Sequence, residues 1–176
     1  DLRPEQAQRQ RENLVKFCLN PQTPYPGRRG ALETIGSFRQ YDSVREILRD
    51  AYTADDSGAR ASAIKGMGRS GASEWLESIM SELSSDDAEI RFEEAQAVGL
   101  LGDEPEVVVL ARLDGDEDVE NRQSAVVSLG RICGRAATRA LGDVLKRAGD
   151  EERDWVEDAL EDAMTLMEPA TYSRYA

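Results

Sequence analysis

A short acidic segment carries the pattern that comes nearest to a metal site. Asp114-Gly115-Asp116-Glu117-Asp118 alternates carboxylates in the way that the loop around a hard cation such as Ca²⁺ does. The rest of a calcium loop does not follow, because its sixth position is Val119 and its twelfth is Ala125, where glycine and glutamate are needed. We therefore interpret the segment as a solvated turn that caps a helix, and we expect no metal and no other cofactor.

Groups for nucleophilic or acid–base catalysis are scarce. The chain has no histidine, which removes the commonest general base. It also has no nucleophile elbow and no glycine-rich phosphate loop. The two cysteines, Cys18 and Cys133, stand alone in helical, apolar contexts that are typical of small core residues. The sequence thus predicts no catalytic residue and no enzyme, and two isolated thiols favour a reducing, cytoplasmic compartment.

The charge balance narrows the class of partner. The 176 residues carry a net charge of −13, which repels phosphate backbones and anionic membrane surfaces. No apolar run is long enough for a membrane span, and no signal-peptide pattern is present. We expect no nucleic acid and no membrane, and a protein partner with basic character. The alternative is that the acidity only keeps the protein soluble.

An internal repeat positions the remaining candidate residues. Five arginines recur at spacings of 32, 31, 31 and 31 residues: Arg28, Arg60, Arg91, Arg122 and Arg153. Each is followed six residues later by a small residue and seven residues later by an apolar one. Eight residues after the first four arginines come Gly36, Gly68, Gly99 and Gly130. Columns that stay in step over five units indicate stacked structural repeats.

Each repeat predicts a helical hairpin. An acidic turn precedes a first helix, a glycine-bearing turn follows it, and a second helix has apolar residues at i, i+3, i+4 and i+7. Such a hairpin buries its apolar face only by stacking on its neighbours. We therefore predict an all-α fold, a right-handed α-α superhelix in one domain over residues 1–176. Its expected parts are an N-terminal helix (5–20), a linker (21–27), repeats (28–56, 57–87, 88–118, 119–149), a terminal half-repeat (150–168) and a tail (169–176).

The best-formed units are Asp87 to Gly99, and Asp118-Val119 followed by Arg122 to Gly130. They resemble the HEAT-like repeats first described in phycobilisome lyases, whose pattern is an acidic turn, an arginine, a run of alanines and Leu-Gly. The resemblance covers about residues 24–167 and implies a HEAT-type solenoid. This repeat serves many unrelated scaffolds, so the resemblance implies no single function. Some members are subunits of lyases for bilin chromophores, and others are binding modules.

Partner binding is expected on the second helices, because these line the concave surface of HEAT-type stacks. Trp75 occupies a column whose other members are Ser43, Glu106 and Ala137, so it is predicted to project as an aromatic anchor. The alternative is that Trp75 fills a local gap in the packing. The other second-helix candidates are Glu74, Glu77, Ser78, Glu82, Arg45, Arg49, Glu106, Val109, Arg112, Arg139 and Asp143.

Two further features have competing interpretations. The arginine column could form a ladder of positive charge, or each arginine could pair structurally with an acidic turn upstream or in the next unit. Trp155 could cover the end of the core or meet the aromatic tail, Tyr172 to Tyr175.

The sequence thus favours a protein-binding scaffold that is monomeric or self-associates weakly through its ends. The alternatives are a subunit of a chromophore lyase and a structural segment of a longer solenoid.

Overall fold

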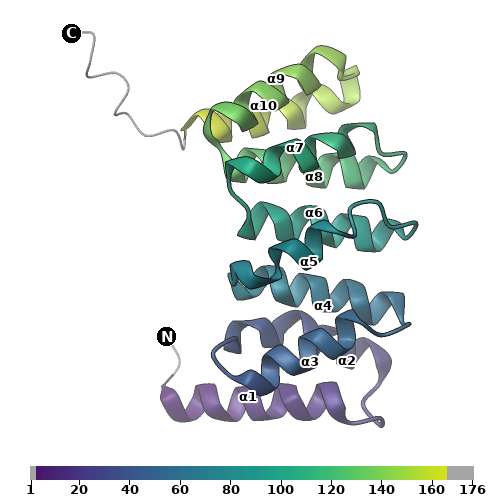
Figure 1. Ribbon diagram of the computed structural model, residues 1–176, viewed down its shortest axis with the longest axis vertical. Helices are drawn as coiled ribbons and strands as arrows, with labels where there is room; N and C mark the ends of the chain where they lie inside the picture. The colour runs from purple at the N-terminus through teal and green to yellow at the C-terminus, as the bar shows by residue number, and fades with distance from the viewer. Residues whose placement is uncertain (1–2, 166–176) are drawn as a thin grey trace, which may run out of the picture. The chain divides into compact units, whose positions relative to one another are not determined.

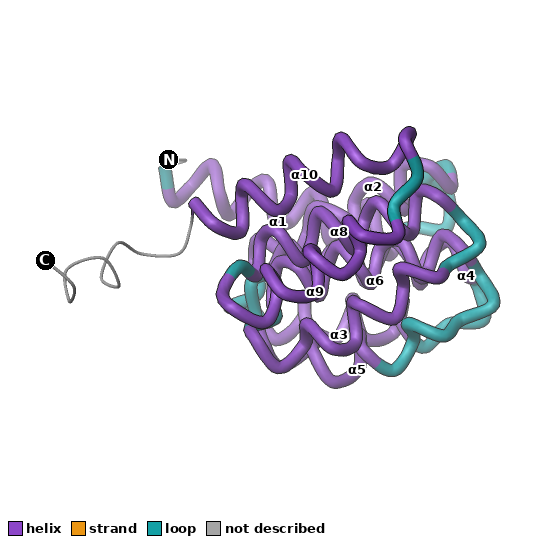
Figure 2. Tube along the Cα trace, turned by 90° about the horizontal axis from the view of Figure 1, so that it is seen from above, coloured by secondary structure: helices purple, strands orange, loops and turns teal. Residues whose placement is uncertain are grey.

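The computed structural model describes residues 3–165 of the chain, and all regular secondary structure in that range is helical (Figure 2). The predicted all-α class is therefore confirmed. The chain separates into two compact units, Asp1–Ala97 and Val98–Ala176. A single domain over residues 1–176 stays a prediction. The predicted tail (169–176) and the last three residues of the predicted half-repeat lie outside the described residues.

Unit 1 is a set of helices in which α4 packs against both α2 and α3, and α1 packs against α2 (Figure 1). Its elements are α1 (Pro4–Leu19), α2 (Tyr25–Ile35), η1 (Gly36–Phe38), α3 (Asp42–Tyr52), α4 (Ser57–Ser70), η2 (Ser73–Trp75), α5 (Leu76–Met80) and most of α6 (Ala88–Leu101). The core consists of apolar side chains from the predicted stripes, which include Ile35, Val44, Ile64 and Met67, all with no exposed surface. Their burial supplies the main driving force for this packing.

Unit 2 repeats the same arrangement with α8 at its centre. Its elements after α6 are η3 (Glu104–Glu106), α7 (Val107–Leu110), η4 (Ala111–Gly115), α8 (Val119–Ile132), α9 (Gly134–Arg147) and α10 (Asp150–Thr165). Helix α8 packs against α10, α9, α7 and η4 (Figure 1). Leu110, Leu129, Leu141 and Val156 fill the space between them.

The acidic turns start helices as predicted. The Asp56 carboxylate accepts a hydrogen bond from the Ala59 backbone N–H at 3.0 Å at the start of α4. The Asp118 carboxylate accepts a hydrogen bond from the Glu120 backbone N–H at 2.9 Å at the start of α8. Each bond satisfies a backbone donor that has no partner inside the helix, and each negative charge lies at the positive end of the helix dipole.

The glycine column marks the places where first helices touch. A Cβ atom added to Gly36 would overlap the carbonyl oxygen of Gly66, and one added to Gly99 would overlap the side chain of Ser128. At Gly130 the nearest atom, the carbonyl oxygen of Ala159, lies 3.0 Å from the added Cβ. In each pair the glycine eight residues after one repeat's arginine contacts the small residue six positions after the next repeat's arginine. The glycine column and the small-residue column therefore form the two sides of one contact between first helices.

The second helices are less regular than the apolar spacing predicts. In the second repeat the α-helix ends at Met80, so Leu83 follows in a turn. In the third repeat α7 changes to 3₁₀ geometry at Ala111. Around Met80 the cause is local, because the Ser81 hydroxyl donates to the Ser78 carbonyl at 2.7 Å and competes with the helical bonding pattern.

Cys133 corrects the expectation that both cysteines lie in helices. It forms the junction between α8 and α9 with φ 54° and ψ −164°, a conformation that favours glycine. Cys18 does lie in a helix, α1, and is half-buried.

The arginine column is structural for most of its members. Arg122 donates to Glu152 of the next acidic turn at 2.5 and 3.0 Å, and to the Asp116 carbonyl at 2.7 Å. Arg91 donates to the Ser85 carbonyl, also six residues upstream, at 2.8 Å. Arg60 pairs with Glu82. For Arg122 the predicted pairing with an acidic turn is confirmed, and a ladder of free positive charges is not formed by these three residues.

Candidate functional site

Trp75 is not the exposed anchor that the sequence suggests. Only 5% of its surface is exposed, so the predicted projection into solvent is wrong and the alternative, packing into a gap, is correct. The physical reason is local geometry. Trp75 ends the 3₁₀ turn η2 and lies beneath the Arg49 guanidinium of α3, so its ring faces α3 and not the solvent. Ala137, in the same column, is also fully buried.

Three other predicted residues of unit 1, Arg45, Arg49 and Glu74, lie close together around Trp75. The Arg49 guanidinium carbon is 5.5 Å from the centre of the Trp75 ring system, within the range of a cation–π contact. Arg45 pairs with Asp42 and places its Nε 4.0 Å from a Glu74 oxygen. We name this region the α3–α5 surface. It consists of Asp42, Arg45, Glu46, Arg49, Asp50, Glu74, Glu77 and Ser78.

The α3–α5 surface has more carboxylates than available cations. Arg45 is held by Asp42 and Glu74, and Arg49 covers Trp75. Glu46, Asp50 and Glu77 are exposed, and no cation among the described residues pairs with them. Glu46 and Asp50 are four residues apart on α3, so they share one face of that helix. The surface therefore has uncompensated negative charge.

Glu82 is half-buried, and other side chains of unit 1 engage its carboxylate. It pairs with Arg60 and accepts a hydrogen bond from the Tyr52 hydroxyl at 3.2 Å. Nearby Glu94 is fully buried, and neither of its carboxyl oxygens has a hydrogen-bond partner. Burial, helped by the negative charge of Glu82 and opposed by the charge of Arg60, raises the pKa of Glu94 to about 9. Glu94 is thus a neutral carboxylic acid at neutral pH.

In unit 2 the predicted residues divide between two roles. Arg139 and Asp143 line a groove of about 360 Å³ on α7 and α9, with an apolar wall that contains Val107, Val108, Ala140 and Val144. Asp143 accepts from Lys146 at 2.7 Å, and this contact holds the pKa of the carboxyl below its usual value. Glu106, Val109 and Arg112 are not part of the groove lining. Glu106 accepts the backbone N–H of Asp103 at 2.7 Å and so caps η3.

Sequence reasoning missed the groove's most exposed apolar residue, Val108, which has 65% of its surface exposed. The comparison of repeat columns selected polar positions, and Val108 stands in a run of three valines that is typical of a buried segment. Its exposure depends on the short α7 and could not be derived from spacing alone.

The acidic segment that resembles the start of a calcium loop is used for structure. Asp114 pairs with Arg147 at 2.5 Å. The Asp116 carboxylate accepts from the Asp118 backbone N–H at 2.9 Å and from the Asn121 amide at 3.2 Å. Among residues 3–165 there is no group of three or more His, Cys, Asp or Glu side chains placed to hold a metal ion. Over the same residues, no helix combines the length and the apolar character that a membrane crossing requires.

The comparisons with known proteins bear on the fold alone. No family model and no curated protein matches the chain. A crystal structure described as that of an engineered protein, from the Northeast Structural Genomics Consortium, is similar with a TM-score of 0.56. The two chains are 19% identical, and the similarity covers 88% of this chain and 79% of the other. At that identity the likeness supports a shared fold and says nothing about function.

Proposed function

We propose that this protein is a non-catalytic binding module, built of HEAT-like helical hairpins, that holds a protein partner with a basic segment. The observation that carries this proposal is the uncompensated charge of Glu46, Asp50 and Glu77 on the α3–α5 surface. Carboxylates without internal partners are available to lysines and arginines of another chain, and complementary charge accelerates encounter and selects the partner.

The buried position of Trp75 supports a rigid form of this surface. Trp75, Arg49 and the Arg45–Glu74 contact tie η2 to α3, so the carboxylates project from elements that are fixed by packing. A preorganised surface loses less entropy on binding than a mobile one. The α7–α9 groove offers a second, apolar site in unit 2 for a partner's side chain.

The proposal is tested by reversing charge on this surface. The double variant Glu46→Lys/Glu77→Lys is compared with Glu151→Lys/Asp158→Lys, which makes the same change in net charge at exposed positions of α10. Partners are captured from native lysate on immobilised protein, identified, purified and titrated. We expect the first variant to bind its partner about tenfold more weakly than wild type, and the α10 variant to bind as wild type does.

Added salt should weaken wild-type binding in the same direction, because screening acts on exposed charges. Equal capture by both double variants would contradict the proposal, and so would a partner whose contact surface is acidic. The two alternatives, a lyase subunit and a segment of a longer solenoid, stay predictions.

A further inference from the structure

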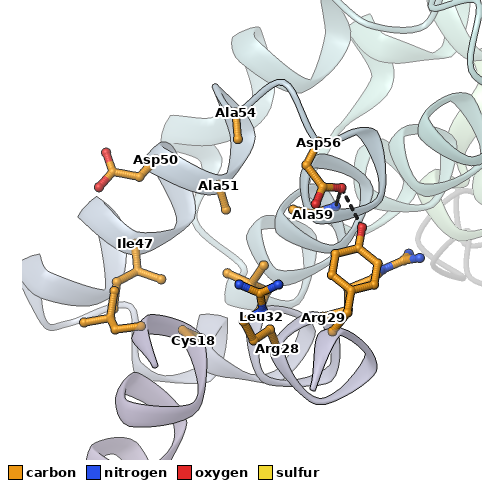
Figure 3. Close-up of a pocket in the computed structure, with 12 residues that line it drawn as sticks. Cys18, Arg28, Arg29, Leu32, Ile47, Asp50, Ala51, Ala54, Asp56 and Ala59 are labelled. Carbon is orange, nitrogen blue, oxygen red and sulfur yellow. Dashed lines mark hydrogen bonds between the residues drawn. The ribbon is translucent and has the colours of Figure 1, made fainter. Parts of the chain in front are cut away.

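A cavity of about 260 Å³ lies in unit 1 between α1, α2, α3 and the start of α4 (Figure 3). Its lining is largely apolar and includes Leu32, Ile47, Ala51 and Ala59. Pockets for small ligands begin at about 300 Å³, so this cavity is suited to a compact group. Nothing in the charge pattern of the sequence indicated it.

Arg28 is the polar group that distinguishes this cavity. In Figure 3 its guanidinium group lies among the lining residues, next to Leu32. The Nε atom is buried and has no hydrogen-bond partner, and no carboxylate among the described residues pairs with the guanidinium. A buried donor without an acceptor costs free energy, so such a group in a native structure requires an explanation.

The repeat explains why Arg28 lacks a partner. Arg60 pairs with Glu82, 22 residues later, and Arg122 pairs with Glu152, 30 residues later. The residue 22 positions after Arg28 is Asp50, whose carboxylate points away from the guanidinium in Figure 3. The residue 30 positions after it is Gly58, which has no side chain to offer. The position that holds a structural ion pair in two other repeats therefore has no carboxylate partner here, and the central carbon of the Arg28 guanidinium lies 5.7 Å from the centre of the Tyr25 ring.

Most of the other polar groups of the cavity are occupied, and the remaining one, the Asp50 carboxylate at the rim, points away from Arg28 in Figure 3. Arg29 donates to the Ser62 hydroxyl at 2.8 Å and pairs with Glu89. Asp56 accepts from the Tyr25 hydroxyl at 2.5 Å and caps α4. The Cys18 thiol is neutral, because burial raises its pKa to about 11. The cavity therefore combines apolar walls with the Arg28 guanidinium, which no carboxylate pairs with.

We propose that this cavity binds a carboxylate attached to a short apolar chain. The carboxylate accepts two hydrogen bonds from the terminal nitrogens of Arg28, which are not enclosed as Nε is, and the chain packs against Leu32, Ile47 and Ala51. A free aliphatic acid and the C-terminal residue of a peptide present the same chemistry. This inference does not depend on the proposed function, because the cavity shares only Asp50 with the α3–α5 surface.

The test measures binding of defined ligands to the full chain by calorimetry and by the NMR shift of the Ile47 methyl group. One arm compares octanoate with octanol, which has the same chain without the charge. The other compares a short peptide ending in a free leucine with the same peptide amidated. We expect octanoate or the free peptide to bind, and the matched neutral ligand to bind about tenfold more weakly or not at all. Which arm binds identifies the source of the carboxylate.

Two variants locate the site. Arg28→Gln removes the charge and keeps most of the side-chain stem, and Arg9→Gln removes an exposed charge from α1 as the matched control. Ala51→Phe fills the cavity and leaves Arg28 in place, so it tests the site even if Arg28→Gln does not fold. Binding should fall about tenfold in Arg28→Gln and in Ala51→Phe and stay unchanged in Arg9→Gln. The inference is overturned if neither acid binds saturably, if the neutral ligands bind equally well, or if Ala51→Phe binds as wild type does.

Discussion

The Arg49 guanidinium lies over the indole of Trp75, and the distance from its central carbon to the ring centre is 5.5 Å. Arg49 is exposed, whereas Trp75 is buried, so the arginine covers the tryptophan from the solvent side. The contact joins α3 to η2 and makes Trp75 a packing residue of unit 1.

Trp75→Ala should therefore destabilise the fold. Removing a buried indole leaves a cavity, and such changes typically cost about 3–5 kcal/mol. Chemical denaturation followed by circular dichroism measures the loss. Trp75→Phe is the matched control, because the buried Nε1 has no hydrogen-bond partner to lose and most of the ring volume is kept. A Trp75→Ala variant as stable as wild type would contradict the buried position.

Glu94 predicts a pH dependence of stability. Its pKa is about 9 in the folded protein and about 4.5 when exposed, so the folded state retains a proton that the unfolded state loses between these values. Stability is complete below about pH 4.5 and falls as the pH rises toward 9, because unfolding then releases a proton. Because the pKa is higher in the folded state than in the unfolded state, the free energy of unfolding decreases as the pH increases.

Glu94→Gln should remove this contribution, because glutamine is neutral at every pH. We expect the variant to be more stable than wild type by about 2 kcal/mol or more near about pH 8, and by much less near about pH 5. Thermal unfolding at both pH values measures the difference. Glu46→Gln changes an exposed, unpaired carboxylate and should show no such dependence. A pH-independent effect of Glu94→Gln would show that Glu94 is ionised in the fold.

The sequence predicted the helical stacking better than it predicted the surface. Arginine and glycine columns report contacts that recur in several repeats, such as Gly36 with Gly66 and Gly130 with Ala159, and recurrence makes them visible in one chain. Trp75 was misplaced because the polar residue Ser43 in its column hid the burial of this position in two other repeats, at Trp75 and Ala137. The missing carboxylate partner of Arg28 could be recognised only after the partners of Arg60 and Arg122 were known.

Cys133 predicts a stabilising substitution. Its φ of 54° and ψ of −164° are strained for any residue with a Cβ atom, and glycine relieves such strain. Cys133→Gly should raise the free energy of unfolding by roughly 1 kcal/mol. Cys133→Ala keeps the Cβ atom and serves as the control, so it should bring no such gain. Urea unfolding of the two variants decides the matter, and a glycine variant no more stable than the alanine variant would contradict the strain.

Gly36 and Gly30 predict opposite effects of the same change at two sites around α2. Gly36→Ala would place a methyl group against the Gly66 carbonyl, with the carbonyl carbon 2.8 Å from the added atom, so α2 and α4 would have to separate. Because that neighbour is backbone, it cannot move aside as a flexible side chain would, and overpacking of this kind costs about 1–3 kcal/mol. Gly30→Ala meets no atom within 4 Å and lies inside α2. It should stabilise the protein by about 0.5–1 kcal/mol, since alanine has the higher helix propensity.

Thermal unfolding of the two variants side by side tests the α2–α4 contact. Equal effects at both positions would mean that the two helices do not approach at Gly36.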